Sequence, residues 1–181
     1  RDLDSSLVGS EMCIRDRAMR HWENPGRAKA RVQRLDRALR GVTDDFDVVL
    51  IDCPPGLGPN VTMALAAADR AVMVAEPSVF SIEAIAPLAD LIDDVWDQYN
   101  PDLDLAGVIV NRVPTVSAEA ERRYEDIAKI VGRRAIWKPV VPQRVLMSEA
   151  AAARHPIHAY RSRAADLIDA FDRHYRKLTR P

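Results

Sequence analysis

The sequence predicts an α/β protein with a doubly wound, mostly parallel sheet and helices on both faces. Three short apolar runs, at residues 47–52, 71–75 and 105–110, are rich in β-branched residues, as strands buried on both faces are. Segments with the apolar spacing of helices separate these runs. Strands that alternate with helices form βαβ units, which give a parallel sheet with right-handed crossovers.

The other elements follow from apolar spacing and from helix-capping residues. Ser81 is expected to cap a helix that runs from Ile82 to about Gln98. No internal repeat or linker divides the chain, so we expect one domain. The further expected elements are helices at 27–41, 60–68, 117–131, 144–153 and about 160–178, and a short fourth strand at 135–137.

Composition limits the classes of function. The 181 residues carry a net charge of −1, and the two cysteines, Cys13 and Cys53, form neither a disulfide framework nor a metal-ligand spacing. No apolar run approaches the roughly 20 residues that span a bilayer. These observations predict a cytoplasmic protein.

Charge is unevenly distributed along the chain. Thirteen acidic residues and one basic residue, Arg70, lie between Asp44 and Asp104, whereas the flanking segments are rich in arginine. This segregation is compatible with a basic face that binds DNA. It is equally compatible with solvated helix surfaces, and the sequence leaves both interpretations open.

The first apolar run ends on a carboxylate. Asp52 closes the run and is followed by the sequence Cys-Pro-Pro-Gly-Leu-Gly at 53–58. A buried carboxylate needs a cation or a water-filled crevice beside it, and open α/β sheets form such a crevice at the carboxyl ends of their strands. The alternative is an aspartate that only opens the turn before the two prolines.

Four polar or turn residues each follow a different predicted strand. They are Asp52, Glu76, Asn111 and Pro142. Parallel strands share one carboxyl edge, so we expect these four residues on the same side of the sheet. A carboxylate that places a metal, next to loops that contact a base, is the arrangement that a nucleotide site requires.

Three motifs together resemble the ParA/MinD family of deviant P-loop ATPases. They are the Asp-Cys-Pro-Pro-Gly segment with the helix after it, the strand that ends at Asn111-Arg112, and the segment Val141 to Ala150 followed by His155-Pro156-Ile157. The motifs occur in the family's order and cover roughly residues 30 to 178. Within the family, the sequence is more similar to the partition ATPases than to MinD.

The resemblance implies a P-loop NTPase fold and a Mg²⁺-dependent ATPase that forms a homodimer with ATP. Such proteins partition plasmids or chromosomes, or position other cargo. Their turnover is stimulated by a ParB-like protein or a cargo adaptor, and they also contact DNA non-specifically. We therefore expect these partners, and no membrane, for the intact protein.

The resemblance also implies roles for individual residues. Asp52 would be catalytic and would place Mg²⁺ through water. The switch segment would be Cys53, Pro54, Pro55 and Gly56. The nucleotide base would lie near Asn111, Arg112 and Pro142.

The phosphate-binding loop of this family is missing from the sequence. None of the four lysines follows a glycine, so no glycine-rich Lys loop exists to cradle phosphates, and the P-loop fold is incomplete. Residues 1–17 are similar to a translated sequencing-adapter read, which predicts a non-native leader. We expect residues 18–181 to be the C-terminal part of a ParA-like ATPase domain, inactive in hydrolysis by itself. The alternative is a shortened, non-hydrolysing module that docks on DNA or on a full-length ATPase.

The C-terminal third departs from the family at one position. Partition ATPases commonly carry an arginine two positions before the serine of Ser148-Glu149-Ala150, where this chain has Leu146. Arg144 and Arg154 lie close enough in sequence to take its place. The apolar stripe of the terminal helix is expected to dock on the domain, not on a membrane: Leu167, Ile168, Phe171, Tyr175 and Leu178.

Overall fold

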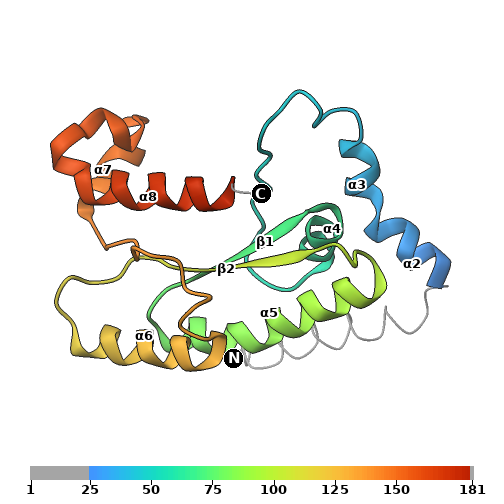
Figure 1. Ribbon diagram of the computed structural model, residues 1–181, viewed down its shortest axis with the longest axis horizontal. Coiled ribbons are helices and arrows are strands. Elements are labelled where there is room, and N and C mark those ends of the chain that lie inside the picture. Colours follow the sequence, from blue (N-terminus) through green and yellow to red (C-terminus); the bar gives the residue numbers. More distant parts are fainter. Residues whose placement is uncertain (1–24, 180–181) are drawn as a thin grey trace, which may run out of the picture.

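The computed structural model describes residues 25–179, and the predicted leader at 1–17 lies outside them. The described elements are α2 (Pro25–Val32), α3 (Arg34–Leu39), α4 (Pro59–Ala67), β1 (Arg70–Ala75), α5 (Val79–Gln98), β2 (Asp104–Val110), α6 (Ala118–Val131), α7 (Val145–Ala153), the 3₁₀ helix η1 (Ile157–Ala164) and α8 (Ala165–Leu178). Figure 1 shows α5 and α6 on one face of the sheet and α8 on the other. The predicted α/β class is confirmed.

The sheet is parallel, as the βαβ order predicts. β1 and β2 pair in register from Arg70 opposite Asp104 to Ala75 opposite Val110, with one irregularity near the start. The 20-residue helix α5 makes the crossover between them. Both strands therefore end at the same edge of the sheet (Figure 1).

Residues 135–142 run along the other edge of β2. The amide of Val108 donates to the carbonyl of Ala135 at 2.9 Å, and the amide of Trp137 donates to the carbonyl of Val108 at 2.8 Å. This segment forms isolated parallel bridges in place of the continuous fourth strand that the sequence predicts. Two prolines within it lack the N–H groups that a continuous ladder needs.

The main core lies between the sheet and the helices α4, α5 and α6. Ile127, Val95 and Val110 are completely buried there. α5 begins three residues earlier than predicted, because Ser78 is its N-cap and accepts a hydrogen bond from the amide of Ser81 at 3.3 Å. The expected helix at 27–41 is present as two shorter helices, α2 and α3.

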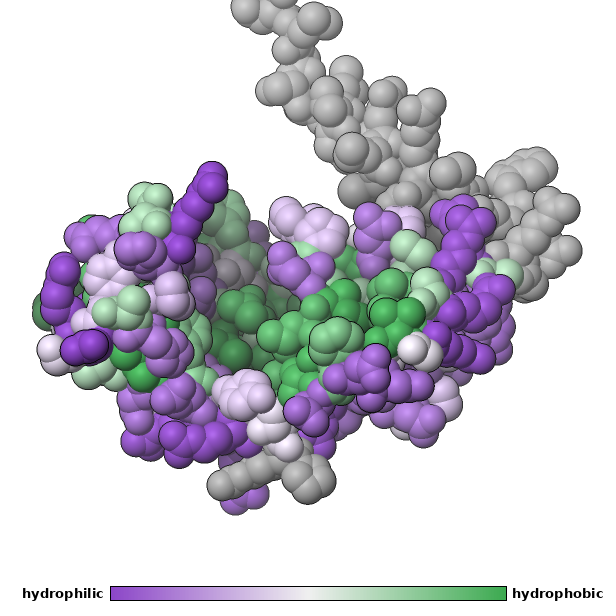
Figure 2. Space-filling view, turned by 90° about the horizontal axis from the view of Figure 1, so that it is seen from above, coloured by the Kyte–Doolittle hydropathy of each residue, from purple (hydrophilic) through white to green (hydrophobic). Residues whose placement is uncertain are grey.

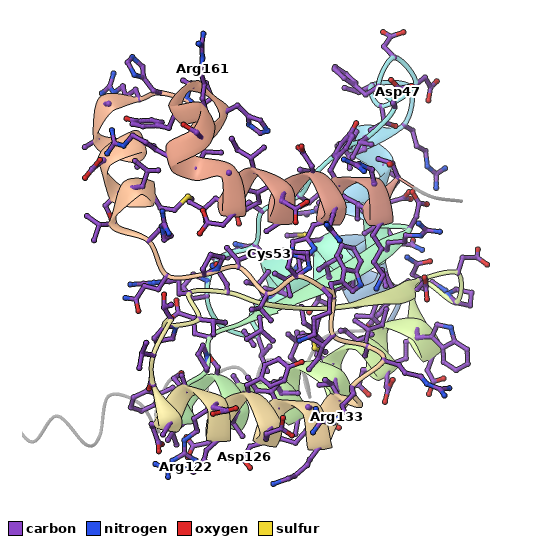
Figure 3. All side chains as sticks on the ribbon, turned by 60° about the vertical axis from the view of Figure 1, so that its left-hand side comes forward. Asp47, Cys53, Arg122, Asp126, Arg133 and Arg161 are labelled. Carbon is purple, nitrogen blue, oxygen red and sulfur yellow. The ribbon has the colours of Figure 1, made fainter. Side chains whose placement is uncertain are left out.

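The most important strand prediction is wrong. Residues 47–52 form no strand: Val49 and Leu50 are exposed, Leu50 at 76%, and Val48 and Ile51 are only half-buried. Strand formation needs a neighbour to accept and donate backbone hydrogen bonds, and none of the described strands pairs with this segment. The loop tip that carries Asp47 projects away from the sheet (Figure 3).

β1 also differs from its prediction as a strand buried on both faces. Met73 and Ala75 are buried toward α5, but Val74 is 62% exposed. The cause is that α8 packs over β2 and residues 135–142 and leaves β1 uncovered. Figure 2 shows hydrophobic side chains gathered on this face of the molecule, beside the α7–α8 region.

A single amide side chain joins α4 to the loop after α5. The Nδ2 group of Asn100 donates to the carbonyl of Ala68 at 2.8 Å and to that of Leu65 at 3.1 Å. Asn100→Ala is expected to lower the free energy of unfolding by about 1–2 kcal/mol, because two half-buried carbonyls lose their donor. Urea denaturation measures this, with Gln98→Ala on the exposed end of α5 as the control. Equal losses in the two variants would contradict the assignment.

Candidate functional site

Backbone hydrogen bonds bring three of the four predicted edge residues together. The amide of Asn111 donates to the carbonyl of Ala75 at 2.8 Å, so the residues that follow β1 and β2 are neighbours. The amide of Val113 donates to the carbonyl of Val141 at 3.0 Å, which brings the loop at Pro142 beside the Asn111 turn. The predicted meeting of these loops at the carboxyl edge is present in the structure.

The turn at Asn111-Arg112 is held in a defined shape. Arg112 has a φ of 53°, in the left-handed region that few non-glycine residues adopt. The Oδ1 atom of Asn111 accepts a hydrogen bond from the amide of Arg112 at 2.9 Å. The Oδ1 atom of Asn111 therefore already accepts a hydrogen bond within the turn. The side-chain NH₂ group of Asn111 is the part that can donate to a ligand.

Glu76 takes part in this site, and the sequence did not predict its contact. Its Oε1 atom lies 3.3 Å from Nη1 of Arg112. Both side chains are largely exposed, so the pair stabilises the fold by less than about 1 kcal/mol. Its role is to orient Arg112 across the edge. The sequence does place opposite charges just past the ends of two adjacent parallel strands, and this pattern could have predicted the contact between Glu76 and Arg112.

The switch segment is exposed and irregular. Asp52, Cys53, Pro54, Pro55 and Gly56 all lie on the surface, between the loop tip and α4. Partial burial raises the pKa of the Cys53 thiol, and the neighbouring Asp52 carboxylate raises it further. No hydrogen bond joins this segment to the Asn111 turn within residues 25–179, so Asp52 is not brought to the other three residues by direct contact.

The described side chains could hold a magnesium ion only together with other ligands. No group of three or more His, Cys, Asp and Glu side chains in the described part of the chain could hold a metal by itself. Mg²⁺ commonly keeps several waters and uses one or two carboxylates together with phosphate oxygens. A magnesium ion at the exposed Asp52 would therefore need phosphate and water as its other ligands.

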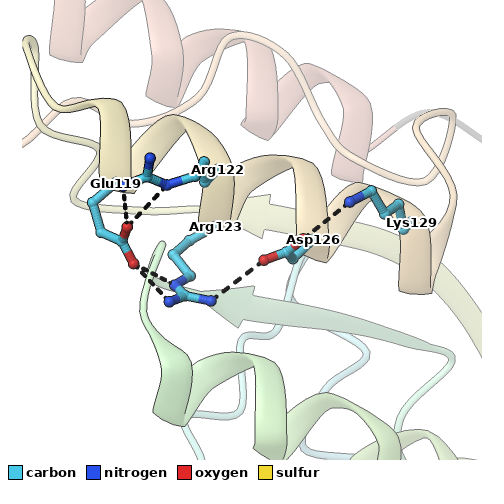
Figure 4. Close-up of polar contacts among 5 residues, drawn as sticks. All are labelled: Glu119, Arg122, Arg123, Asp126 and Lys129. Atoms are coloured by element: carbon cyan, nitrogen blue, oxygen red, sulfur yellow. Dashed lines mark hydrogen bonds and ion pairs between the residues drawn. The ribbon is translucent and has the colours of Figure 1, made fainter.

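The exposed face of α6 favours the solvated interpretation of its charges (Figure 4). Glu119 accepts hydrogen bonds from Arg122 and Arg123, each at 2.7 Å, and these bonds lower its pKa, with that from Arg122 the larger cause. Asp126 contacts Lys129 at 3.1 Å and Arg123 at 3.4 Å. These cations are paired with acids on the same helix, so this face does not present a basic patch.

The two arginines that could replace the family's DNA-contacting arginine differ in their surroundings. Leu146 is buried and cannot contact DNA. Arg144 is paired with Asp166 at 3.1 Å. Arg154 ends α7 in the left-handed conformation and is exposed, and it is the better placed of the two. No helix among residues 25–179 is long and apolar enough to span a membrane.

Comparisons with known proteins show which family the chain resembles. The AAA_31 family model, described as an AAA domain, matches residues 7–105. The sporulation initiation inhibitor protein Soj of Bacillus subtilis is 32% identical over 140 residues, which are 76% of this chain and 55% of that protein. The chromosome partitioning protein ParA of Myxococcus xanthus is 31% identical over 70% of this chain and 44% of its own length.

Solved structures show the same fold. Cobyrinic acid a,c-diamide synthase from Mycobacterium smegmatis, with a bound ATP analog and magnesium, is 28% identical with a TM-score of 0.57, over 64% of this chain and 45% of that one. Apo McdA from Cyanothece is 17% identical with a TM-score of 0.74, over 82% and 59%. The chain spans about half the length of the curated relatives it matches.

The parallel sheet, the helices on both faces and the loops that meet at its carboxyl edge define an α/β protein of the P-loop NTPase type. Within that class, the chain belongs to the ParA-like P-loop ATPases.

Proposed function

We propose that this chain is the C-terminal portion of a ParA-like ATPase that acts in plasmid or chromosome partition or in cargo positioning. The observation that supports this most strongly is the meeting of Glu76, the Asn111-Arg112 turn and the Pro142 loop at one edge of the sheet. The relatives named for chromosome partitioning support the partition role. The cytoplasm is the expected compartment.

Each group at this edge has a proposed task. ATP is bound with its base near Asn111, Arg112 and Pro142, where the free NH₂ group of Asn111 donates to an acceptor of the base. Asp52 would hold a water of the Mg²⁺ shell and orient the attacking water, and the bound Mg²⁺ would supply charge that neutralises the phosphates. The residues from Cys53 to Gly56 respond to the terminal phosphate, which is consistent with their exposure and irregular backbone.

The partners follow from the same role. ATP binding is proposed to drive homodimerisation, and a ParB-like protein or cargo adaptor to stimulate turnover. Non-specific DNA is a further proposed ligand, with the exposed Arg154 as its most accessible candidate contact.

Hydrolysis and dimerisation test the proposal. We compare this chain with a longer protein in which the genomic in-frame coding sequence upstream of residue 18 replaces residues 1–17, and measure Mg²⁺-dependent phosphate release and ATP-dependent dimerisation by light scattering. The longer protein is expected to hydrolyse ATP and to dimerise, and this chain alone to do neither. In the longer protein, Asp52→Ala is expected to lower turnover at least about a hundredfold, because the attacking water loses its orientation.

The matched control is Asp47→Ala, which removes a carboxylate from the tip of the same loop (Figure 3). It should leave turnover unchanged. Turnover by this chain alone, or full activity of Asp52→Ala, would contradict the proposed mechanism. If the longer protein contains no phosphate loop and hydrolyses no ATP, the protein instead acts as the shortened, non-hydrolysing module that docks on DNA or on a full-length ATPase.

A further inference from the structure

The face of α8 that packs on the sheet contains a buried histidine. Leu167, Ala170 and His174 lie at helical spacing on this face, and the first two are completely buried. His174 is 6% exposed, whereas Tyr175, which the sequence placed on the apolar stripe, is 57% exposed. The buried face that holds α8 against the sheet therefore includes an ionisable imidazole.

Among residues 25–179, the imidazole of His174 has no hydrogen-bond partner. Both ring nitrogens are buried and unpaired, although the carbonyl of Pro139 faces the ring without meeting hydrogen-bond geometry. The ring packs against Trp137, with centroids 5.8 Å apart and planes inclined at 43°. An apolar side chain would fill this position at lower cost, since a buried, unsatisfied polar group destabilises a fold.

The charges around His174 oppose its protonation. Lys177 lies one turn further along α8, with its Nζ atom 4.9 Å from the centroid of the Trp137 ring. Burial lowers the pKa of His174 and the charge of Lys177 lowers it further, while the Pro139 carbonyl acts in the opposite direction. No carboxylate in the described residues bonds to the ring.

Several charged groups on the elements that pack against α8 have other partners. Lys138 contacts the hydroxyl of Tyr124 on α6 at 2.6 Å. Arg70, at the start of β1, lies 3.9 Å from Asp104 and donates to the carbonyl of Leu178. On the η1 side, His158 pairs with Asp172 and Arg163 pairs with Glu149. The charged groups engaged in these contacts therefore form no ion pair with a protonated His174.

We propose that His174 is a pH-sensitive latch, which holds α8 against the sheet when it is neutral and releases the helix when it is protonated. Protonation adds a second N–H group to the ring and places a second cation close to Lys177, inside a contact that excludes water. Release uncovers the indole of Trp137 and the apolar side chains of Ile109 and Val141. The device controls the exposure of an apolar surface and does not depend on ATP.

The direction of the pH effect follows from the lowered pKa. The undocked helix has a histidine of ordinary pKa, 6.5, and the docked helix has a lower one. Docking is therefore at full strength above pH 6.5, and it weakens as the pH falls from there to the depressed value. For each pH unit by which the two pKa values differ, the equilibrium constant for release of α8 is roughly tenfold larger at low pH than at neutral pH.

Hydrogen exchange detected by mass spectrometry tests the latch, from about pH 7.5 to about pH 5 with rates corrected for intrinsic exchange. Peptides from 165–178 are expected to lose protection as the pH falls, while those from α5 keep theirs. His174→Leu should keep α8 protected at both ends of the range. His155→Gln changes an exposed histidine just after α7 and should behave like the unchanged chain.

Three results would overturn the proposal. The first is loss of α8 protection in His174→Leu over the same pH range as in the unchanged chain. The second is simultaneous loss in α5 and α8, which is global acid unfolding. The third needs no variant at His174: an NMR titration in which its ring protonates at the ordinary pKa while α8 stays docked. Fluorescence adds a local signal, because Trp22→Phe and Trp96→Phe leave Trp137 as the sole tryptophan of three.

Discussion

Gly107→Ala is expected to be among the most damaging single substitutions in the described part of the chain. Gly107 lies in β2 with a φ of 146°, a conformation that side-chain-bearing residues rarely adopt. A Cβ atom there would lie 2.3 Å from Nε1 of Trp137 and 2.6 Å from the carbonyl oxygen of Ala135. The second of these is a backbone atom, so the clash cannot be relieved by a side-chain rotation.

The expected loss of unfolding free energy is roughly 3 kcal/mol or more, from backbone strain together with overpacking. The hydrogen bond from the Trp137 indole to the carbonyl of Ala106, at 2.9 Å, should also be lost. Urea denaturation gives the free energy, and the near-ultraviolet circular dichroism of Trp137 reports its displacement. Gly58→Ala is the control, because nothing lies within 4 Å of its Cβ position and its φ is −80°. A change below about 1 kcal/mol in Gly107→Ala would show that β2 shifts freely.

Leu167→Ala is expected to lower the unfolding free energy by about 2–5 kcal/mol, since it leaves a cavity at a completely buried position. Leu167 is part of the small core in which α8 meets Val141. The same denaturation measurement should show this loss in full at about pH 7.5, where α8 is docked.

Tyr175→Ala, on the exposed side of α8, is the control and should change stability by less than about 0.5 kcal/mol. A loss in Leu167→Ala as small as in this control would mean that α8 contributes little to the fold. If the loss in Leu167→Ala grew strongly as the pH fell, the effect of the cavity at Leu167 could not be separated from the effect of the charge on His174.

Much of the fold could be predicted because it depends on local sequence. The strands at 71–75 and 105–110 and the helices α4, α6 and α7 lie within about two residues of their predicted positions. Apolar periodicity and capping serines specify such elements from within. The meeting of Asn111 and Pro142 could also be predicted, because it follows from parallel order alone.

The errors concern contacts between distant parts of the chain. Residues 47–52 have the composition of a buried strand, but a strand exists only where another pairs with it, and the described residues provide none. The location of Asp52 relative to the Asn111 turn was inferred from that strand and stays a prediction. His174 was not expected in the core, because a histidine within a helix of mixed charge gives no sign that it will meet Trp137.

Among residues 25–179, no strand other than β2 pairs with β1, so its other edge is open, and this has a practical consequence for anyone who handles the chain. A strand whose outer backbone groups are unpaired is a template for the same strand of another molecule, and the apolar Val74 beside it adds to the attraction. Concentrated preparations should consequently self-associate through main-chain pairing. A lysine in place of Val74 would keep the molecules apart, since a charge on such an edge opposes intermolecular β-pairing.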